Sequence, residues 1–228
     1  MAGTLSRRRF LATAGAAAVT VTGVSGMALI AAFGTREEAA ACMRPPGALP
    51  EEEFLSACIR CGRCADACPN RCIVAFTRDT AREHSLVPGR RQLGTPVLFA
   101  RRQACMLCNG TQGENLLCTE ACPSGALQLT AKAPAAILAG VRMGTAEVDT
   151  NICYSFNGAS CGVCVRACPF EGSALRAGMW EKPLVDPEVC VGCGLCERSC
   201  VHYPQAIRVR PSTSDRPTGS ARSVDREA

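Results

Sequence analysis

The run Cys58, Cys61, Cys64 and Cys68, with Pro69 directly after it, constrains this chain more than any other feature. Two residues separate each of the first three cysteines from the next, and three residues separate the third from the fourth. In bacterial iron–sulfur proteins this spacing places three thiolates on one [4Fe–4S] cluster and the fourth on a second cluster. A single run therefore requires a partner run elsewhere in the chain.

Three further runs of four cysteines follow the first. They are Cys105, Cys108, Cys118 and Cys122; Cys153, Cys161, Cys164 and Cys168; and Cys190, Cys193, Cys196 and Cys200. Thiolates are the soft ligands that iron–sulfur clusters use, and sixteen of them suffice for four [4Fe–4S] clusters. We therefore predict four clusters, with these sixteen cysteines as iron ligands. Cys42 and Cys72 are surplus; each is most simply a free thiol, and Cys72 as a substitute ligand is the alternative.

A disulfide scaffold and a zinc protein are the two other classes of protein with this many cysteines. Disulfide frameworks space their cysteines irregularly, whereas every run here ends in C-x-x-x-C, three times followed by proline. Zinc knuckles need neither the third cysteine step nor the proline. Aromatic residues are only 4% of the chain, too few for an ordinary apolar core. Clusters and their cysteines are therefore expected to supply much of the interior.

Residues 1–41 have the pattern of an export signal. Arg7 and Arg8 precede an uncharged stretch that ends at Phe33 and is rich in Ala, Gly, Thr and Val, which is typical of a twin-arginine (Tat) signal. The stretch is long enough to span a bilayer, so retention as an uncleaved anchor is the alternative. The Tat route carries folded proteins, which suits a chain that receives its clusters before export. We predict a periplasmic location, with membrane association if the anchor is retained.

Short strands and helices repeat around the cysteine runs. A short helix is expected to start near the fourth cysteine of each run, followed by strands at 73–76, 127–129, 174–176 and 206–209; further strands are expected at 146–149 and 183–186, and helices at 51–57 and within 132–144. This repeat predicts an α+β fold with two bacterial-ferredoxin-like modules of β-α-β units, each holding two clusters. The four-cluster domain is predicted to span 42–210. Residues 211–228 lack apolar periodicity and are expected to be a disordered tail.

Two other segments left alternatives open. Residues 44–48 read Arg-Pro-Pro-Gly-Ala, which cannot be helical because proline fixes its own backbone and restrains the residue before it. This lead-in is either ordered or flexible. Residues 77–104 contain six arginines, which fit either a docking surface for an acidic redox partner or a solvated loop.

Charge and motif content argue against nucleic acid as a partner and against catalysis. The formal net charge is +5, but an oxidised [4Fe–4S] cluster with four thiolates carries about −2, so four clusters make the folded unit acidic. Basic charge is therefore no evidence for nucleic acid. The chain has two histidines and no nucleophile elbow, phosphate-binding loop or dinucleotide fingerprint. We predict an electron carrier with no catalytic residues.

The whole pattern resembles the NapG/MauM family of periplasmic ferredoxin-type proteins. The resemblance rests on the Tat signal, the 44–48 lead-in, the first run, the stretch from Cys118 to Ala126 and the stretch from Cys190 to Cys196. The chain departs from the pattern in the nine residues between Cys108 and Cys118, and in Val201, which replaces proline after the last run.

The resemblance implies an electron relay on the outer side of the cytoplasmic membrane. Its donor would be a polytopic, quinol-oxidising membrane protein of the NapH/MauN type. Its acceptor would be a periplasmic oxidoreductase, either a molybdenum nitrate reductase or a methylamine-type quinoprotein system. Two other functions stay open: a fixed electron-transfer subunit of a molybdenum oxidoreductase, and an accessory protein for maturation of a periplasmic enzyme.

The pairing of the runs is the remaining question. Only 21 residues separate Cys168 from Cys190, a short link that favours pairing of consecutive runs. The resemblance to four-cluster subunits of molybdenum oxidoreductases instead implies a nested order, first run with fourth and second with third, and we expect that order. Its ligand sets would be Cys58, Cys61, Cys64 and Cys200; Cys68, Cys190, Cys193 and Cys196; Cys105, Cys108, Cys118 and Cys168; and Cys122, Cys153, Cys161 and Cys164.

Overall fold

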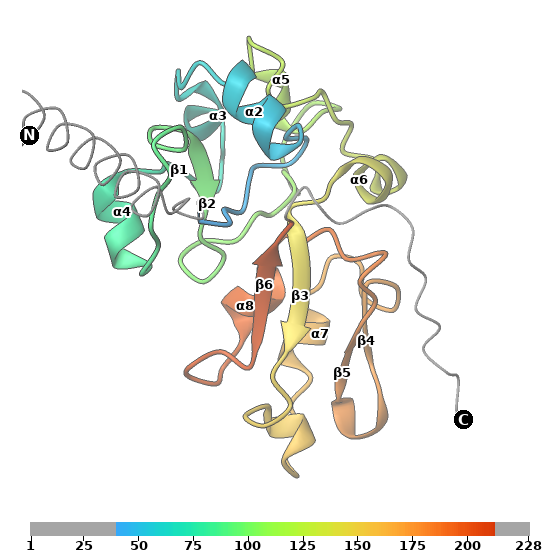
Figure 1. The fold of residues 1–228 in the computed structure, drawn as a ribbon. Coiled ribbons are helices and arrows are strands. Elements are labelled where there is room, and N and C mark those ends of the chain that lie inside the picture. Colours follow the sequence, from blue (N-terminus) through green and yellow to red (C-terminus); the bar gives the residue numbers. More distant parts are fainter. Residues whose placement is uncertain (1–39, 213–228) are drawn as a thin grey trace, which may run out of the picture. The chain divides into compact units, whose positions relative to one another are not determined.

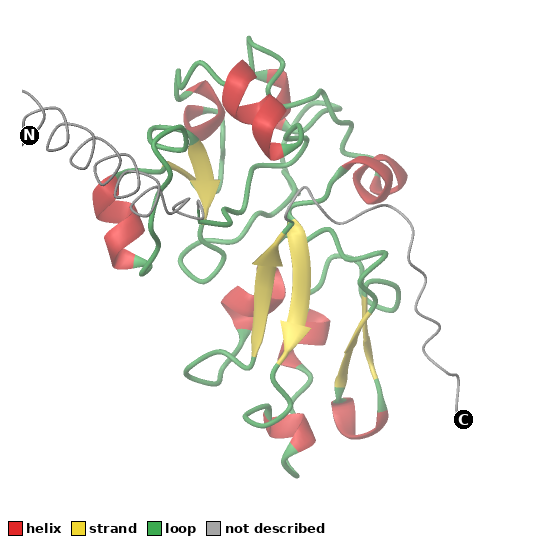
Figure 2. Cartoon of the chain, viewed as in Figure 1, coloured by secondary structure: helices red, strands yellow, loops and turns green. Residues whose placement is uncertain are grey.

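The structure of the protein is a computed structural model that describes residues 40–212. The predicted signal segment, except for residues 40 and 41, and the predicted tail from residue 213 onward lie outside the described residues. The described residues form short helices and three two-stranded antiparallel sheets (Figure 1, Figure 2). This mixture agrees with the predicted α+β class. None of the helices within 40–212 has the length and apolar character needed to cross a membrane.

The C-terminal module follows the predicted β-α-β repeat twice. Strand β3 pairs with β6, which ends at Pro211, and β4 pairs with β5, so the first and last strands lie side by side (Figure 1). Two 3-10 turns, η1 and η2, extend the loops. The elements in chain order are β3 (Gly144–Val148), η1 (Tyr154–Phe156), α7 (Val163–Arg166), β4 (Leu175–Ala177), η2 (Met179–Glu181), β5 (Pro183–Val185), α8 (Leu195–Ser199) and β6 (Ile207–Pro211).

The N-terminal module has the same plan with weaker strand pairing. Its elements are α2 (Glu51–Ala57), α3 (Arg63–Asp66), β1 (Ile73–Ala75), α4 (Arg78–Glu83), β2 (Pro96–Leu98) and α5 (Leu117–Glu120), and α6 (Pro134–Gly140) connects it to β3. Strands β1 and β2 correspond to the β4–β5 pair. The lead-in takes the place of β3: Gln128 N–H donates to Gly47 O (2.7 Å) and Leu49 N–H donates to Ala126 O (3.1 Å).

Most predicted elements are present, and the differences are local. The helices at 51–57 and within 132–144 and five of the six strands are confirmed within a residue or two. The strand at 127–129 is reduced to one bridge, Ala48 with Leu127. The arginine-rich segment is not a plain loop, because it contains α4, capped by a reciprocal Thr77–Thr80 pair, and strand β2.

The lead-in is ordered, because Arg44 fixes it to the module. Its guanidinium makes a bidentate ion pair with Glu51 (2.8 and 2.6 Å) and donates to Thr95 Oγ1 and Pro96 O. The same group lies 4.7 Å from the centre of the Phe54 ring. Arg44 is only 7% exposed, so this buried guanidinium has a partner for most of its N–H groups.

Cysteines form a large part of the main apolar core. This core continues from the N-terminal module into the C-terminal one, since Val191 belongs to it as well as Phe54 and Leu116. The buried cysteines within it are Cys64, Cys72, Cys105, Cys118 and Cys193. A smaller core lies under β3, β4 and β6. The interior is therefore built around thiols, as the scarcity of aromatic residues predicted.

Candidate iron–sulfur site

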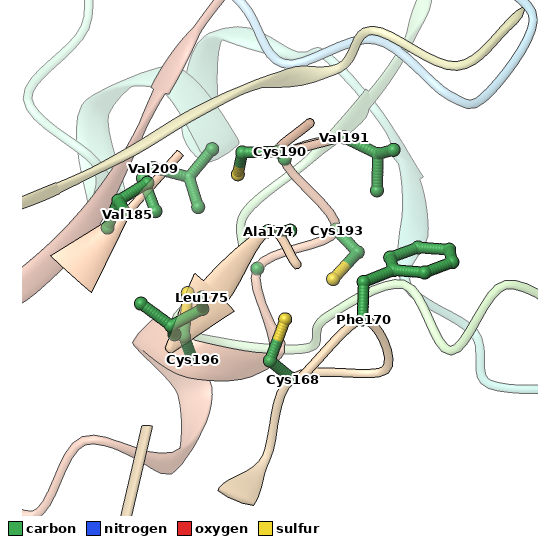
Figure 3. A pocket seen from close by; sticks show the side chains of 13 residues that line it. Cys168, Phe170, Ala174, Leu175, Val185, Cys190, Val191, Cys193, Cys196 and Val209 are labelled. Carbon is green, nitrogen blue, oxygen red and sulfur yellow. The ribbon is translucent and has the colours of Figure 1, made fainter. Parts of the chain in front are cut away.

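Two cavities in the C-terminal module are each lined by four of the predicted ligands. The first, shown in Figure 3, has Leu175, Val185 and Val209 on one side and Phe170 and Val191 on the other. Its four thiols, called set III here, are Cys168, Cys190, Cys193 and Cys196. The second cavity contains set IV, which is Cys153, Cys161, Cys164 and Cys200. In each set one run supplies three cysteines and its partner supplies one.

The N-terminal module repeats this arrangement. Burial, together with charge on the neighbouring Cys58, Cys122 and Cys61, raises the pKa of the Cys64 thiol to about 11. These four cysteines are called set I. Burial also raises the pKa of Cys118, and charge on Cys105, Cys108 and Cys68 and, least, on Cys64 of set I adds to the effect; Cys118 and the first three of these are set II. A bound metal removes this penalty, because coordination to iron favours the thiolate.

The nested pairing of the runs is therefore wrong. The first run pairs with the second and the third with the fourth, as the short link between Cys168 and Cys190 had favoured. The reason lies in the fold: β3 pairs with β6 within one module, which brings the end of the fourth run back to the third. Cys200 consequently completes set IV rather than joining the first run.

Glycines and prolines shape the turns of several of the runs. Helices α3 and α8 begin after Gly62 and Gly194, which have left-handed φ angles of 78° and 83°, a conformation that favours glycine. Each helix carries the third cysteine of its run and ends before or at the residue preceding the fourth, so the prediction that the helix starts near the fourth cysteine is wrong. Proline after the fourth cysteine of the first three runs cannot continue the helix.

Backbone amides point at several of the sulfurs. Leu107, Leu117 and Leu127 N–H groups donate to Cys105, Cys108 and Cys122 Sγ respectively, each at 3.4 Å. Such donors stabilise negative charge on the sulfur and tune the reduction potential of a bound cluster. Sequence reasoning missed these donors, because a backbone amide has no residue-type signal.

The donor sets fit an iron–sulfur cluster better than the alternatives. All eighteen cysteines are free thiols, so the disulfide scaffold has no support. Four thiolates on one zinc ion, at about 2.3 Å each, would stand less than roughly 4 Å apart. Within residues 40–212 no three His, Cys, Asp or Glu side chains are arranged to hold a single metal ion. Sets III and IV each line a cavity with four thiols, which suits a multinuclear cluster.

Comparison with known proteins points to the same chemistry. A family model described as a 4Fe-4S dicluster domain matches residues 57–126, and one described as a 4Fe-4S binding domain matches 159–172 and 187–200. The methylamine utilization ferredoxin-type protein MauM of Methylorubrum extorquens is 37% identical over 216 residues, which cover 90% of this chain and 89% of the relative. This chain belongs to the family of MauM and NapG ferredoxin-type proteins.

NapG relatives match equally well. The ferredoxin-type protein NapG of Escherichia coli is 37% identical over 220 residues, which cover 90% of this chain and 85% of the relative. Membership of the MauM and NapG family confirms the resemblance stated from the motifs. It also supports an iron–sulfur electron-transfer protein. The dicluster match to 57–126 contains the first two runs together, which agrees with their pairing in the structure.

In this member of the MauM and NapG family the two surplus cysteines have different surroundings. Cys72 is buried, and its sulfur lies 3.5 Å from that of Cys68 in set II. Hydrogen bonds to Cys105 and Cys68, together with burial, raise the pKa of Cys72, so it keeps its proton at neutral pH. Cys42 packs in a separate small core with Phe76, and burial raises its pKa to about 11. Only Cys72 is therefore next to a ligand set.

Proposed function

We propose that sets I to IV each hold one [4Fe–4S] cluster and that the chain is an electron carrier without substrate chemistry of its own. The observation that carries this proposal is the grouping of sixteen thiols into four sets of four. A bound [4Fe–4S] cluster supplies one-electron transfer. The protein's own residues hold the cluster through thiolates, donate backbone hydrogen bonds to the sulfurs, and exclude water with apolar side chains such as Phe170 and Val191.

We further propose a periplasmic relay between two partners. Electrons would come from a quinol-oxidising membrane protein of the NapH/MauN type and pass to a periplasmic oxidoreductase. The Tat-like residues 1–41 and the names of the relatives support this placement. Because MauM and NapG relatives match at the same identity, methylamine and nitrate systems are equally supported as the acceptor side.

The accessibility of the sets fits such a relay. Sets II and III each contain two buried cysteines, whereas sets I and IV contain one each, and Cys61 of set I is exposed. Near set IV, Val201 is 61% exposed and Tyr203 84%. Sets I and IV are therefore the places where a protein partner can approach a cluster closely. Sets II and III would pass electrons between them inside the protein.

Iron and acid-labile sulfide analysis of anaerobically purified protein tests the cluster content. About sixteen of each per chain are expected for four clusters, and electron paramagnetic resonance after dithionite reduction should show interacting cubane signals. Little iron, or zinc in its place, would overturn the proposal.

Quinol and membranes then test the relay. Membranes that contain the polytopic partner should reduce the clusters when quinol is added, and membranes without the partner should not. Equal reduction by both membranes would rule out that donor. Reoxidation by the purified periplasmic oxidoreductase tests the acceptor side.

A further inference from the structure

Sets II and III meet at one contact between the two modules. The backbone N–H of Cys105, a set II cysteine, donates to the carbonyl oxygen of Cys193, a set III cysteine, at 2.9 Å. Both side chains are buried, 7% and 8% exposed, and both belong to the same apolar core. No other ligand residues in the described part of the chain share a direct backbone hydrogen bond between modules. We call this contact, with residues 99–105 and 191–200 around it, the seam.

The absence of a side chain at Gly194 allows the two modules to pack closely at the seam. A Cβ atom added at Gly194 would overlap the methyl group of Ala100 and lie 3.7 Å from that of Ala104. Gly62 occupies the same position in the first run and has nearly the same φ, but a Cβ there would meet nothing within 4 Å. The turn itself is therefore common to both positions, and the close packing against the other module is specific to Gly194.

Arg101 links the two modules on the exposed side of the seam. Its Nη1 atom lies within hydrogen-bonding distance of three carbonyl oxygens at the end of α8, those of Glu197, Arg198 and Cys200 (3.2–3.5 Å). A cation is favourable at a helix C-terminus, where carbonyl groups have no partner in the helix. Its neighbour Arg102 instead faces Glu83 within the N-terminal module, at 3.9 Å.

We propose that the seam is the route by which electrons pass between the two modules, with Gly194 as the positioning residue that keeps sets II and III in contact. This inference rests on the proposed four-cluster function. The clusters would then act in the order set I, set II, set III, set IV. Tunnelling rates fall steeply with distance, so a side chain that separates Ala100 from residue 194 slows this one step. One electron moves from one reduced cluster to its oxidised neighbour, and no bond is formed or broken.

The test compares Gly194→Ala with Gly62→Ala in the full chain loaded with clusters. Both substitutions put a Cβ on a left-handed glycine that precedes a short helix, so the backbone strain is matched. Gly194→Ala is expected to slow severalfold the equilibration of an electron injected by a flash-driven reductant. It should also weaken the magnetic interaction between reduced clusters that crosses the seam. Gly62→Ala changes the set I turn but adds no contact with the other module, so the magnetic interaction across the seam and the electron transfer between sets II and III should keep the values of the unchanged protein.

A compensating substitution gives the second control. In Gly194→Ala/Ala100→Gly the methyl group is removed from one side of the seam and added to the other, so the rate should return toward that of the unchanged protein. A general loss of stability would not be rescued in this way. Equal equilibration rates in Gly194→Ala and Gly62→Ala, both with full iron content, would overturn the seam route. An iron content well below sixteen in the unchanged protein would instead overturn the proposed function.

Arg101→Gln provides an independent variant should Gly194→Ala fail to fold. It removes the hydrogen bonds to the carbonyl groups at the end of α8, including that of Cys200, but leaves every ligand sulfur in place, and Arg102→Gln is its matched control. Slower equilibration in Arg101→Gln alone supports the seam, and equal rates in both variants contradict it.

Discussion

The fourth cysteine of each run does not group with the first three cysteines of that run. It completes the set formed by the first three cysteines of the partner run. Cys122 belongs to set I, although it follows three cysteines of set II in the chain. Cys68 belongs to set II, although it follows three cysteines of set I. In both cases a short helix, α3 or α5, carries the third cysteine and precedes the fourth. The same short helix therefore links a cysteine of one set to a cysteine of the other set of its module.

Double substitutions distinguish this pairing from the nested one. Cys61→Ala/Cys122→Ala removes two ligands of set I, so three intact clusters should remain. Cys61→Ala/Cys200→Ala removes one ligand each from sets I and IV, so two should remain. Spin integration of the reduced [4Fe–4S] signals, with iron analysis, measures the number. The nested order predicts the opposite result for the two variants.

Cys72 is expected to tune a cluster and not to bind it. As a thiol next to Cys68 and Cys105, it donates a hydrogen bond to a ligand sulfur, which favours the more negative, reduced state. Cys72→Ala should therefore keep the full iron content and lower the reduction potential of the set II cluster in a redox titration. Cys42→Ala is the control, because Cys42 is also buried but lies in another core. Loss of iron in Cys72→Ala would show that Cys72 is a ligand.

The grouping of the cysteines into four runs could be read from spacing alone, but which run completes which set could not. Spacing such as Cys58-x-x-Cys61 is local, and it reports how one turn wraps around a cluster. Which run completes a set depends on contacts such as those of Gly47 with Gln128, which join positions far apart in the chain. The 21-residue link before Cys190 carried the correct signal, and the analogy with larger four-cluster subunits overrode it.

At the scale of elements, the Arg44–Glu51 ion pair joins the lead-in to α2 and β2. Burial would raise the pKa of Glu51, but hydrogen bonds from Arg44 and Gln92 hold it below its ordinary value of 4.5. A carboxylate with a lowered pKa in the folded state stabilises the protein above its ordinary pKa. This contribution is lost as the pH falls through the lowered value.

Arg44→Met should therefore be strongly destabilising at pH 7. Removing one partner of a buried pair costs about 3–5 kcal/mol of the free energy of unfolding, measured by the urea midpoint under anaerobic conditions. The difference from the unchanged protein should narrow as the pH approaches and passes 4.5, because a protonated Glu51 tolerates burial. Arg91→Met is the control: the Arg91–Glu52 pair is equally short, 2.6 Å, but exposed, so about 0–1 kcal/mol is expected. Equal effects of the two substitutions would contradict this account.

Element positions were more predictable in the C-terminal module than in the N-terminal one. Strands β3 to β6 have alternating or β-branched sequences and pair along their length. The lead-in has two prolines, which cannot donate ladder hydrogen bonds, so its single bridge to Leu127 was not visible. The buried position of Arg44 depends on Glu51 and Thr95 meeting it in space, which no local pattern reports.

At the scale of the whole molecule, the pattern of residues 1–41 predicts export by the Tat route. Replacing Arg7 and Arg8 together by Lys should strand folded, cluster-containing protein in the cytoplasm, because the Tat route requires the twin arginine. Cell fractionation with iron analysis of each fraction measures this. Replacing Arg9 alone by Lys is the control and should leave export unchanged. Normal export of the double variant would rule out the Tat route.

The pairing of consecutive runs also affects how the protein is made. All ligands of sets I and II lie between Cys58 and Cys122, and all ligands of sets III and IV lie between Cys153 and Cys200. The first half therefore has every cysteine ligand of its own two sets before the ribosome reaches the second half. A gene divided within the α6 segment would therefore still encode two polypeptides, each with complete ligand sets.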